Sequence, residues 1–327
     1  MHAHDPNEAA PNDRPIYGLP VDADVLFCDK NGVRKKSIEK KKSRLLQKLT
    51  FLSRFLDADE RIVFVTPACS PFSALEQMTI GYAWVYMMKR ALLVFTNKRI
   101  LHVPTTPKYD YRGSVAQILY QDCRRQYVKG STFLVEYHSG KKERFHGIPG
   151  ADRAAIKRLN IDAGEFGPRS ERPERNHLCP NCASVLAPQQ YACPSCNLAF
   201  RNKAKALRYS LLIPGGGYFY VRRWGMGVLD AIVESYLLLI FLGATFASLL
   251  GDPEALPVAA GLAVVLTLEK LITIYHANQF LAEFVPQDLK AIQIHRPAQT
   301  TPAPEPQPQA ESSEPQKEST ERVLSLR

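Results

Sequence analysis

A long apolar run near the carboxyl end is the strongest hydrophobic pattern in the chain. Ser235 to Leu250 contains no charged residue. Extending the run back to Val228 admits only Asp230 and Glu234, and it then reaches the ~20 residues that a membrane-spanning helix needs. The pattern therefore predicts a transmembrane helix over about residues 228–250.

A second apolar run follows after a short polar turn, residues 251–254. It covers residues 255–268, is interrupted by Glu269 and Lys270, and resumes over residues 271–285 with three polar residues in it. An uninterrupted run this short also suits a buried core helix. The turn is only long enough for a tight hairpin, so we favour a second transmembrane helix over about residues 255–283.

Basic residues on the flanks of the two runs indicate an orientation. Lys and Arg precede the first run and follow the second, whereas the turn between the runs has neither. By the positive-inside rule, both termini are expected in the cytosol. The basic flanking residues are Arg201, Lys203, Lys205, Arg208, Arg222, Arg223, Lys290 and Arg296.

The segment before the first run has its own pattern within a membrane region that we place at residues 201–289. A helix beginning near Lys205 should end at Pro214, which three glycines follow. Residues 209–213 are then a short interfacial or re-entrant segment, followed by an aromatic and basic anchor. The string SLLIPGGGYFYVRRWGMG resembles the segment that leads into small bacterial two-helix membrane modules.

Two residues of opposite charge, Glu234 and Lys270, lie inside the two apolar runs. At ~1.5 Å per helical residue, Glu234 and Lys270 lie at nearly the same depth in an antiparallel hairpin. We expect them to pair and to set the register of the hairpin, with Asp230 and Glu269 nearer water. The alternative is that Lys270 extends to the interface and Glu234 is protonated or hydrated.

Between residues 58 and 160, the hydrophobic pattern has the period of β-strands. Short β-branched or aromatic runs alternate with turn signals, and a helical segment, residues 152–159, closes the block. Residues 69–88 have a helical pattern instead and are an insertion or an amphipathic cover. The predicted strands include residues 62–65, 92–96, 99–103 and 132–137.

This block resembles the bacterial pleckstrin-homology-like (PH-like) domains. The resemblance is carried by ALLVFTNKRILHV (residues 91–103), by YRGSVAQILYQD (residues 111–122) and by the closing helix. It implies a β-barrel or sandwich with a C-terminal helix that binds or assembles near a membrane. It does not imply catalysis.

Four cysteines form the most specific motif in the chain. Cys179, Cys182, Cys193 and Cys196 follow the pattern C-x2-C-x10-C-x2-C, which offers four thiolates to one tetrahedral ion. Zinc takes four sulfurs at about 2.3 Å, and a full shell of protein ligands makes the ion structural. The segment 177–200 resembles the small zinc ribbons of bacterial proteins, with Asn197 in place of the glycine common after the last cysteine.

Other interpretations of the cysteines remain open. A redox dithiol or an iron-sulfur site would use some of these four cysteines or a different spacing, and His177 could substitute for one ligand. The remaining Cys28, Cys69 and Cys123 are expected to be ordinary small apolar residues. We identify no nucleophile turn, and His102, His138 and His146 are isolated, so no catalytic residue is predicted.

Composition indicates the remaining segments. Residues 1–30 and the Pro-, Glu- and Gln-rich residues 290–327 are expected to be disordered, and residues 161–176 form a linker. No signal peptide is visible. Residues 31–57 predict an amphipathic helix with a strongly basic first half. That half is either a solvated helix face or a contact for lipid or nucleic acid.

The sequence thus predicts a multidomain protein of the bacterial inner membrane, with a PH-like domain, a zinc ribbon and a two-helix hairpin. The formal charge of +10 points to an anionic partner. We expect a non-enzymatic adaptor or sensor that binds a protein, a lipid headgroup or a second copy of itself. The alternative is a membrane-tethered nucleic-acid-binding protein, although residues 178–200 contain no Lys or Arg.

Overall fold

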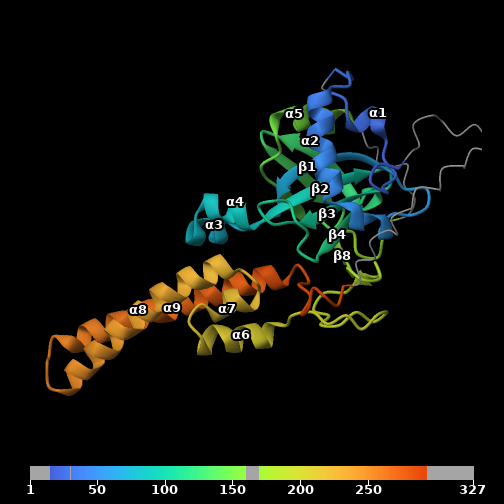
Figure 1. Cartoon of the computed structure of the whole chain (residues 1–327). Helices are drawn as coiled ribbons and strands as arrows, with labels where there is room; N and C mark the ends of the chain where they lie inside the picture. Colours follow the sequence, from blue (N-terminus) through green and yellow to red (C-terminus); the bar gives the residue numbers. More distant parts are fainter. Residues whose placement is uncertain (1–14, 30, 160–168, 293–327) are drawn as a thin grey trace, which may run out of the picture. The chain divides into compact units, whose positions relative to one another are not determined.

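The computed structural model describes residues 15–29, 31–159 and 169–292 (Figure 1). Most of the predicted disordered termini and linker lies outside these ranges. Residues 15–29, however, are ordered against the N-terminal domain. This segment contains helix α1 (Ala23–Leu26), and its residues Leu19, Leu26 and Phe27 are buried in the core of the N-terminal domain.

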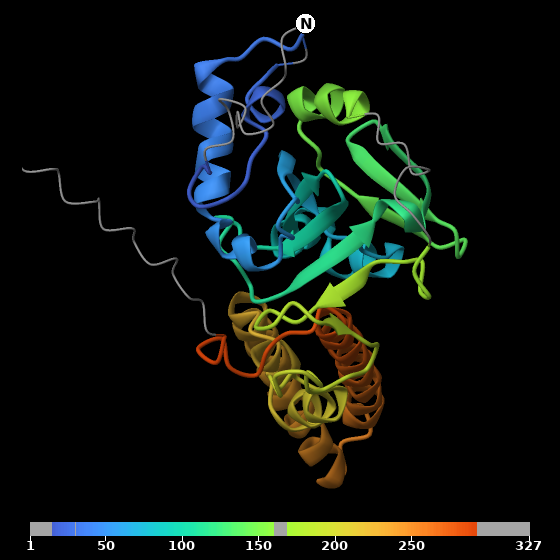
Figure 2. The same ribbon diagram turned by 90° about the vertical axis from the view of Figure 1, so that its right-hand side faces the viewer.

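A six-stranded antiparallel sheet dominates the N-terminal half (Figure 2). Its strand order is β1-β2-β3-β4-β8-β9, so strands that are far apart in the sequence meet at its far edge. The strands are β1 (Ile62–Cys69), β2 (Arg90–Thr96), β3 (Arg99–Pro104), β4 (Val115–Leu119), β8 (Asn176–Leu178) and β9 (Val185–Leu186). Strands β1 to β3 are buried on both faces, which explains their nearly continuous apolar sequences.

A second, three-stranded sheet packs against the first. It contains β5 (Cys123–Lys129), β6 (Thr132–Tyr137) and β7 (Lys142–Phe145), and a single turn of 3-10 helix, η2 (Tyr120–Asp122), precedes it. Phe95 and Phe133 meet between the sheets with their ring centroids 5.4 Å apart. Both sheets therefore enclose one hydrophobic core.

Of the two expected arrangements, a barrel or a sandwich, the closed barrel is not formed. Over the described residues, the two sheets are joined at the β1–β7 side only by an isolated bridge, in which the Cys69 amide donates to the His146 carbonyl over 2.7 Å. The reason is that β1 ends at Cys69, where the chain leaves the sheet. The structure is thus a domain of two antiparallel sheets, closed at one end by helix α5 (Gly150–Arg158).

The basic segment forms helix α2 (Lys36–Gln47) and the 3-10 helix η1 (Thr50–Arg54). One of its lysines is not at the surface. Lys42 is 2% exposed, its ammonium lies 2.9 Å from the Asp152 carboxylate of α5, and it donates to the Val65 carbonyl over 2.5 Å. Lys42 therefore joins α2, β1 and α5, and only the other cations of α2 are available to a partner.

Residues between β1 and β2 form two short helices, α3 (Ala74–Ile80) and α4 (Tyr82–Met88). They are an insertion into the sheet domain, as one of the two sequence interpretations proposed. Polar contacts join α3 to the C-terminal helices, whereas the Tyr86 ring of α4 packs beside Gly147 and Arg90 of the sheet domain.

Helices α6 (Lys203–Leu212) and α7 (Gly216–Tyr220) form a helical turn around the glycine run. The glycines are required by close packing. A Cβ on Gly215 would lie 2.1 Å from the Gly227 carbonyl oxygen, and one on Gly216 would lie 2.1 Å from the Tyr209 carbonyl oxygen. Gly215 also has a positive φ of 66°, a conformation that glycine adopts more readily than any residue with a side chain.

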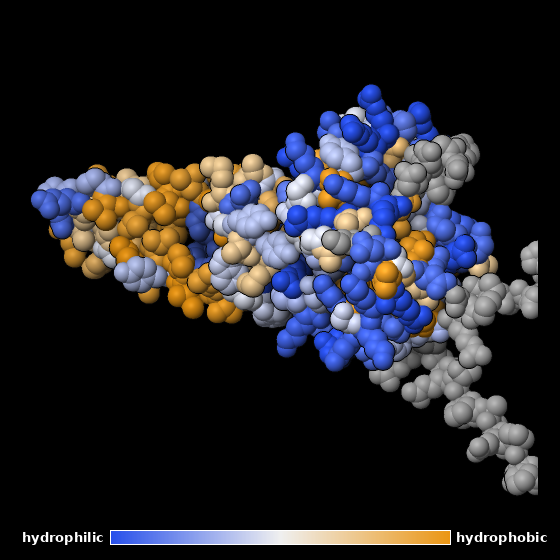
Figure 3. Space-filling view, turned by 90° about the horizontal axis from the view of Figure 1, so that it is seen from above, coloured by the Kyte–Doolittle hydropathy of each residue, from blue (hydrophilic) through white to orange (hydrophobic). Residues whose placement is uncertain are grey.

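The two apolar runs form the antiparallel helices α8 (Trp224–Leu249) and α9 (Ala255–Leu281), joined by a short turn. Both are long and apolar enough to cross a membrane. Only 6% and 11% of their most apolar windows are buried, so they are not core helices within the chain. Figure 3 shows their hydrophobic side chains at the surface, bounded at the tip of the hairpin by a hydrophilic turn.

Candidate metal centre and the sites around it

The four predicted cysteine ligands come together. The Sγ atoms of Cys179, Cys182, Cys193 and Cys196 all lie within 4.8 Å of one another, and the Cys179–Cys196 and Cys182–Cys193 pairs are 3.5 Å apart. The edge of a tetrahedron of sulfurs around zinc would be about 3.8 Å for bonds of about 2.3 Å. The donor set and its spacing therefore fit one tetrahedral metal ion.

Each C-x2-C segment forms a tight turn, or knuckle, that is closed by a backbone hydrogen bond. The Ala183 amide donates to the Cys179 carbonyl, and the Asn197 amide donates to the Cys193 carbonyl, each over 2.9 Å. Ala183 and Asn197 both adopt positive φ, 59° and 56°. Asn197 therefore takes the left-handed conformation that its position requires, as the sequence predicted.

The cysteine site is built onto the sheet. Strand β8 pairs with β4, placing Leu178 opposite Val115 and His177 opposite Ala116, and Cys179 follows directly. His177 lies outside the cysteine cluster, and its ring is tilted against that of Phe284, with ring centroids 5.0 Å apart. Burial lowers the pKa of His177 to about 3, so this imidazole is neutral.

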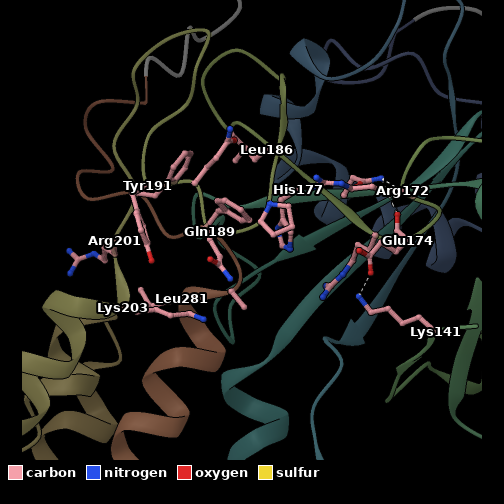
Figure 4. A pocket seen from close by; sticks show the side chains of 17 residues that line it. Lys141, Arg172, Glu174, His177, Leu186, Gln189, Tyr191, Arg201, Lys203 and Leu281 are labelled. Atoms are coloured by element: carbon pink, nitrogen blue, oxygen red, sulfur yellow. Dashed lines mark hydrogen bonds and ion pairs between the residues drawn. The ribbon is translucent and has the colours of Figure 1, made fainter. Parts of the chain in front are cut away.

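A cavity of about 350 Å³ adjoins the cysteine site. Its wall is made by the chain around β8, by the cysteine ribbon, by the start of α6 and by the end of α9. Figure 4 shows His177 in the middle of this lining, with Tyr191 and Lys203 on one side and Lys141 and Glu174 on the other.

The lining of the cavity is strongly cationic. Five basic side chains contribute to it against one carboxylate, Glu174, which is already paired with Lys141 over 2.7 Å. Arg175 is also paired, with Glu143 over 3.3 Å, whereas Arg172, Arg201 and Lys203 have no carboxylate partner among the described residues. The cavity can therefore accept an anionic group. The basic residues are Lys141, Arg172, Arg175, Arg201 and Lys203.

The structure brings Glu234 and Lys270 together within the hairpin, as predicted. The Lys270 ammonium contacts the Glu234 carboxylate and also donates to the Ser210 carbonyl of α6 over 2.6 Å. Glu234 in turn accepts the Gly215 amide over 3.2 Å. The pair thus ties α8 and α9 to the glycine turn.

The other two hairpin carboxylates also join this group. The Thr273 hydroxyl lies 3.2 Å from Asp230 and 2.8 Å from Glu269. Carboxylate oxygens of Asp230, Glu234 and Glu269 lie within 4.8 Å of one another. The expectation that Asp230 and Glu269 simply lie nearer water is therefore incomplete, because helix packing turns both of them toward Thr273.

One arrangement that sequence reasoning missed resembles part of a hydrolase site. Ser70 Oγ lies 2.8 Å from His102 Nε2, but the group on His102 Nδ1 is the Arg175 guanidinium, 3.0 Å away, instead of a carboxylate. Burial and the Arg175 charge hold the pKa of His102 well below its usual range. Ser70 and His102 are both at most 1% exposed, so this pair is a packed hydrogen bond.

No protein-family model, curated protein or solved structure matches this chain. The fold and the sites therefore define the class of protein. It has a domain of two antiparallel sheets, a four-cysteine cluster suited to a metal ion, and two candidate membrane helices.

Proposed function

We propose that the protein is a membrane-anchored, non-enzymatic adaptor or sensor of the bacterial inner membrane. In this proposal the sheet domain is PH-like, the cysteine cluster holds structural zinc, and both termini lie in the cytosol. The ligand binds in the cationic cavity beside the zinc ribbon.

The observation that carries the proposal is the place of this cavity in the chain. Its lining combines the edge of the sheet domain, the ribbon, Lys203 of α6 and Leu281 of α9. Occupancy by a ligand would therefore connect the folded domain to the membrane helices, which is what an adaptor or sensor requires.

An anionic phospholipid headgroup suits the cavity best. Leu281 and Ala282 lie where α9 leaves its apolar span, so the cavity is at the level expected for headgroups. Arg172 and Lys203 can contribute charge-assisted hydrogen bonds to a phosphate, and the apolar part of the lining can contact the glycerol end of a lipid.

The test is lipid retention by the intact protein. We expect native mass spectrometry of the detergent-solubilised chain to show bound phosphatidylglycerol in preference to phosphatidylcholine. The double variant Arg172→Gln/Lys203→Gln should lose most of this preference. The control Lys108→Gln/Lys129→Gln removes the same charge from exposed positions outside the cavity and should retain it. Equal retention by both variants would reject the cavity as the lipid site.

The second candidate, a membrane-tethered nucleic-acid-binding protein, rests on the exposed cations of α2. These include Lys36, Lys40 and Lys41. Binding of the reconstituted protein to duplex and single-stranded oligonucleotides should then fall steeply with salt concentration. Such binding, lost on replacing these three lysines by Gln, would favour this candidate over the adaptor.

A further inference from the structure

Helices α3 and α4 are held as a structured unit. The Ser73 hydroxyl accepts the Glu76 amide, and the Glu76 carboxylate accepts the Ser73 amide, which caps α3. Glu76 also pairs with Lys89 at the end of α4 over 2.6 Å, with both side chains nearly buried. This insertion is therefore built to hold a defined conformation.

The unit docks on α9 and on the start of α8. Ser73 Oγ lies 2.8 Å from the Tyr275 hydroxyl, and Thr79 Oγ1 lies 2.9 Å from His276 Nε2. Arg223 donates to the Met88 carbonyl over 2.5 Å. These contacts place α3 and α4 beside the cytosolic ends of the two candidate membrane helices.

The remaining surface of the unit is apolar and exposed. Met78 is 83% exposed, and Leu75, Tyr82, Trp84 and Met87 are each between 41% and 49% exposed. A contiguous surface of this kind marks an interface with a partner or with a membrane.

The position of the docking contacts indicates the bilayer as the partner. Tyr275 and His276 lie about one helical turn from Leu271 and Ile272, which are exposed on α9 and continue its apolar surface. The contacts of α3 with Tyr275 and His276 therefore bring the exposed apolar side chains of α3 and α4 close to those of the hairpin. Trp and Tyr are also the side chains enriched at the membrane–water interface.

We propose that α3 and α4 form a second membrane attachment, lying in the cytosolic interface of the bilayer beside the hairpin. This inference rests on the proposed membrane insertion of α8 and α9. Together with the hairpin, the attachment would hold β1 and β2 near the membrane surface, since four residues separate β1 from α3 and one residue separates α4 from β2. A single flexible tether would not restrict the sheet domain in this way.

The chain offers a direct test because it has only two tryptophans, Trp84 on α4 and Trp224 at the start of α8. The variant Trp224→Phe leaves Trp84 as the reporter, and Trp84→Phe leaves Trp224. Each full-length variant is reconstituted into vesicles with phosphatidylcholine brominated near the headgroup end or near the methyl end of its acyl chain. We expect both reporters to lose more emission to the shallow bromines than to the deep ones, and to be protected from aqueous iodide.

Each other outcome overturns a defined part of the proposal. Quenching of Trp224 by bromolipid, with Trp84 quenched only by iodide, would place the hairpin in the bilayer and α3 and α4 in water. Protection of Trp84 from both quenchers would mean that a second copy or another protein covers the unit. If neither tryptophan responds to bromolipid, the hairpin itself is not inserted and the proposed function fails.

Discussion

At the residue scale, the paired charges in the hairpin account for how polar groups are tolerated in an apolar span. A lone charge at this depth costs about 1–3 kcal/mol on insertion scales. Here the Lys270 ammonium has both the Glu234 carboxylate and the Ser210 carbonyl as partners. In the proposed membrane hairpin, the pair would offset part of the insertion cost and would favour one register of α8 against α9.

We predict that Glu234→Gln and Lys270→Met each lower the abundance and thermal stability of the membrane-inserted protein. Each single variant leaves one charge without its partner, so the double variant should recover part of the loss. Thermal unfolding of the purified variants in detergent measures this coupling as a double-mutant cycle. Strictly additive losses would show that the two charges do not stabilise one another.

At the element scale, the two cysteine knuckles have the local backbone geometry of a metal site. The segment around the four cysteines has few buried apolar residues of its own, so we expect a metal ion bound by the cysteines to hold the two knuckles together. Its strand β8 is nevertheless part of the large sheet. Loss of the metal should therefore affect β4, which is sixty residues earlier in the chain.

We predict one zinc ion per chain, lost in Cys193→Ser. Elemental analysis measures the zinc, and hydrogen exchange measures the effect on the sheet, with faster exchange expected at residues 115–117 of β4, which pair with β8. Cys28→Ser is the matched control because Cys28 lies outside the cluster. Absence of zinc from the unmodified protein, or unchanged hydrogen exchange at β4 in Cys193→Ser, would contradict the prediction.

The glycine turn gives a second prediction at this scale. Gly216→Ala should destabilise the protein by about 1–3 kcal/mol, because its Cβ would overlap the Tyr209 carbonyl oxygen. Gly225→Ala is the control, since nothing lies within 4 Å of a Cβ there and alanine favours the helix. Thermal unfolding should separate the two variants, and equal behaviour would argue against tight packing at the turn.

At the scale of the whole molecule, the charges around α8 and α9 favour one orientation for the proposed membrane hairpin. The turn between α8 and α9 carries Asp252 and Glu254 and no basic residue, whereas cations flank the other ends of both helices. If both helices span the membrane, as proposed, the positive-inside rule predicts that the chain before α8 and the chain after α9 lie on the same side.

We predict that reporter fusions at Phe200 and at Arg327 both give the cytosolic signal, and that a reporter inserted at Asp252 gives the external one. Paired alkaline phosphatase and fluorescent-protein fusions in a bacterial host measure this topology. An external signal at Arg327 would mean that only one of the two helices spans the membrane.

The sequence by itself determined the features that depend on neighbouring residues. The spacing of Cys179, Cys182, Cys193 and Cys196 predicts their cluster because each knuckle is closed by its own backbone. The two apolar runs predict α8 and α9, and short apolar runs between turn signals predict four of the nine described strands, namely β1, β2, β3 and β6. Simple helix geometry was also sufficient to place Glu234 beside Lys270.

Only the tertiary structure decided the features that join distant segments. Pairing of β8 with β4, burial of Lys42 against Asp152, and docking of α3 on α9 each connect residues more than fifty positions apart. Backbone hydrogen bonding at a sheet edge depends little on the side chains, because every residue except proline has both a backbone donor and a backbone acceptor. The sequence therefore does not show which strands pair there. For the same reason, the sequence could not reveal that the two sheets remain unclosed where the chain leaves β1.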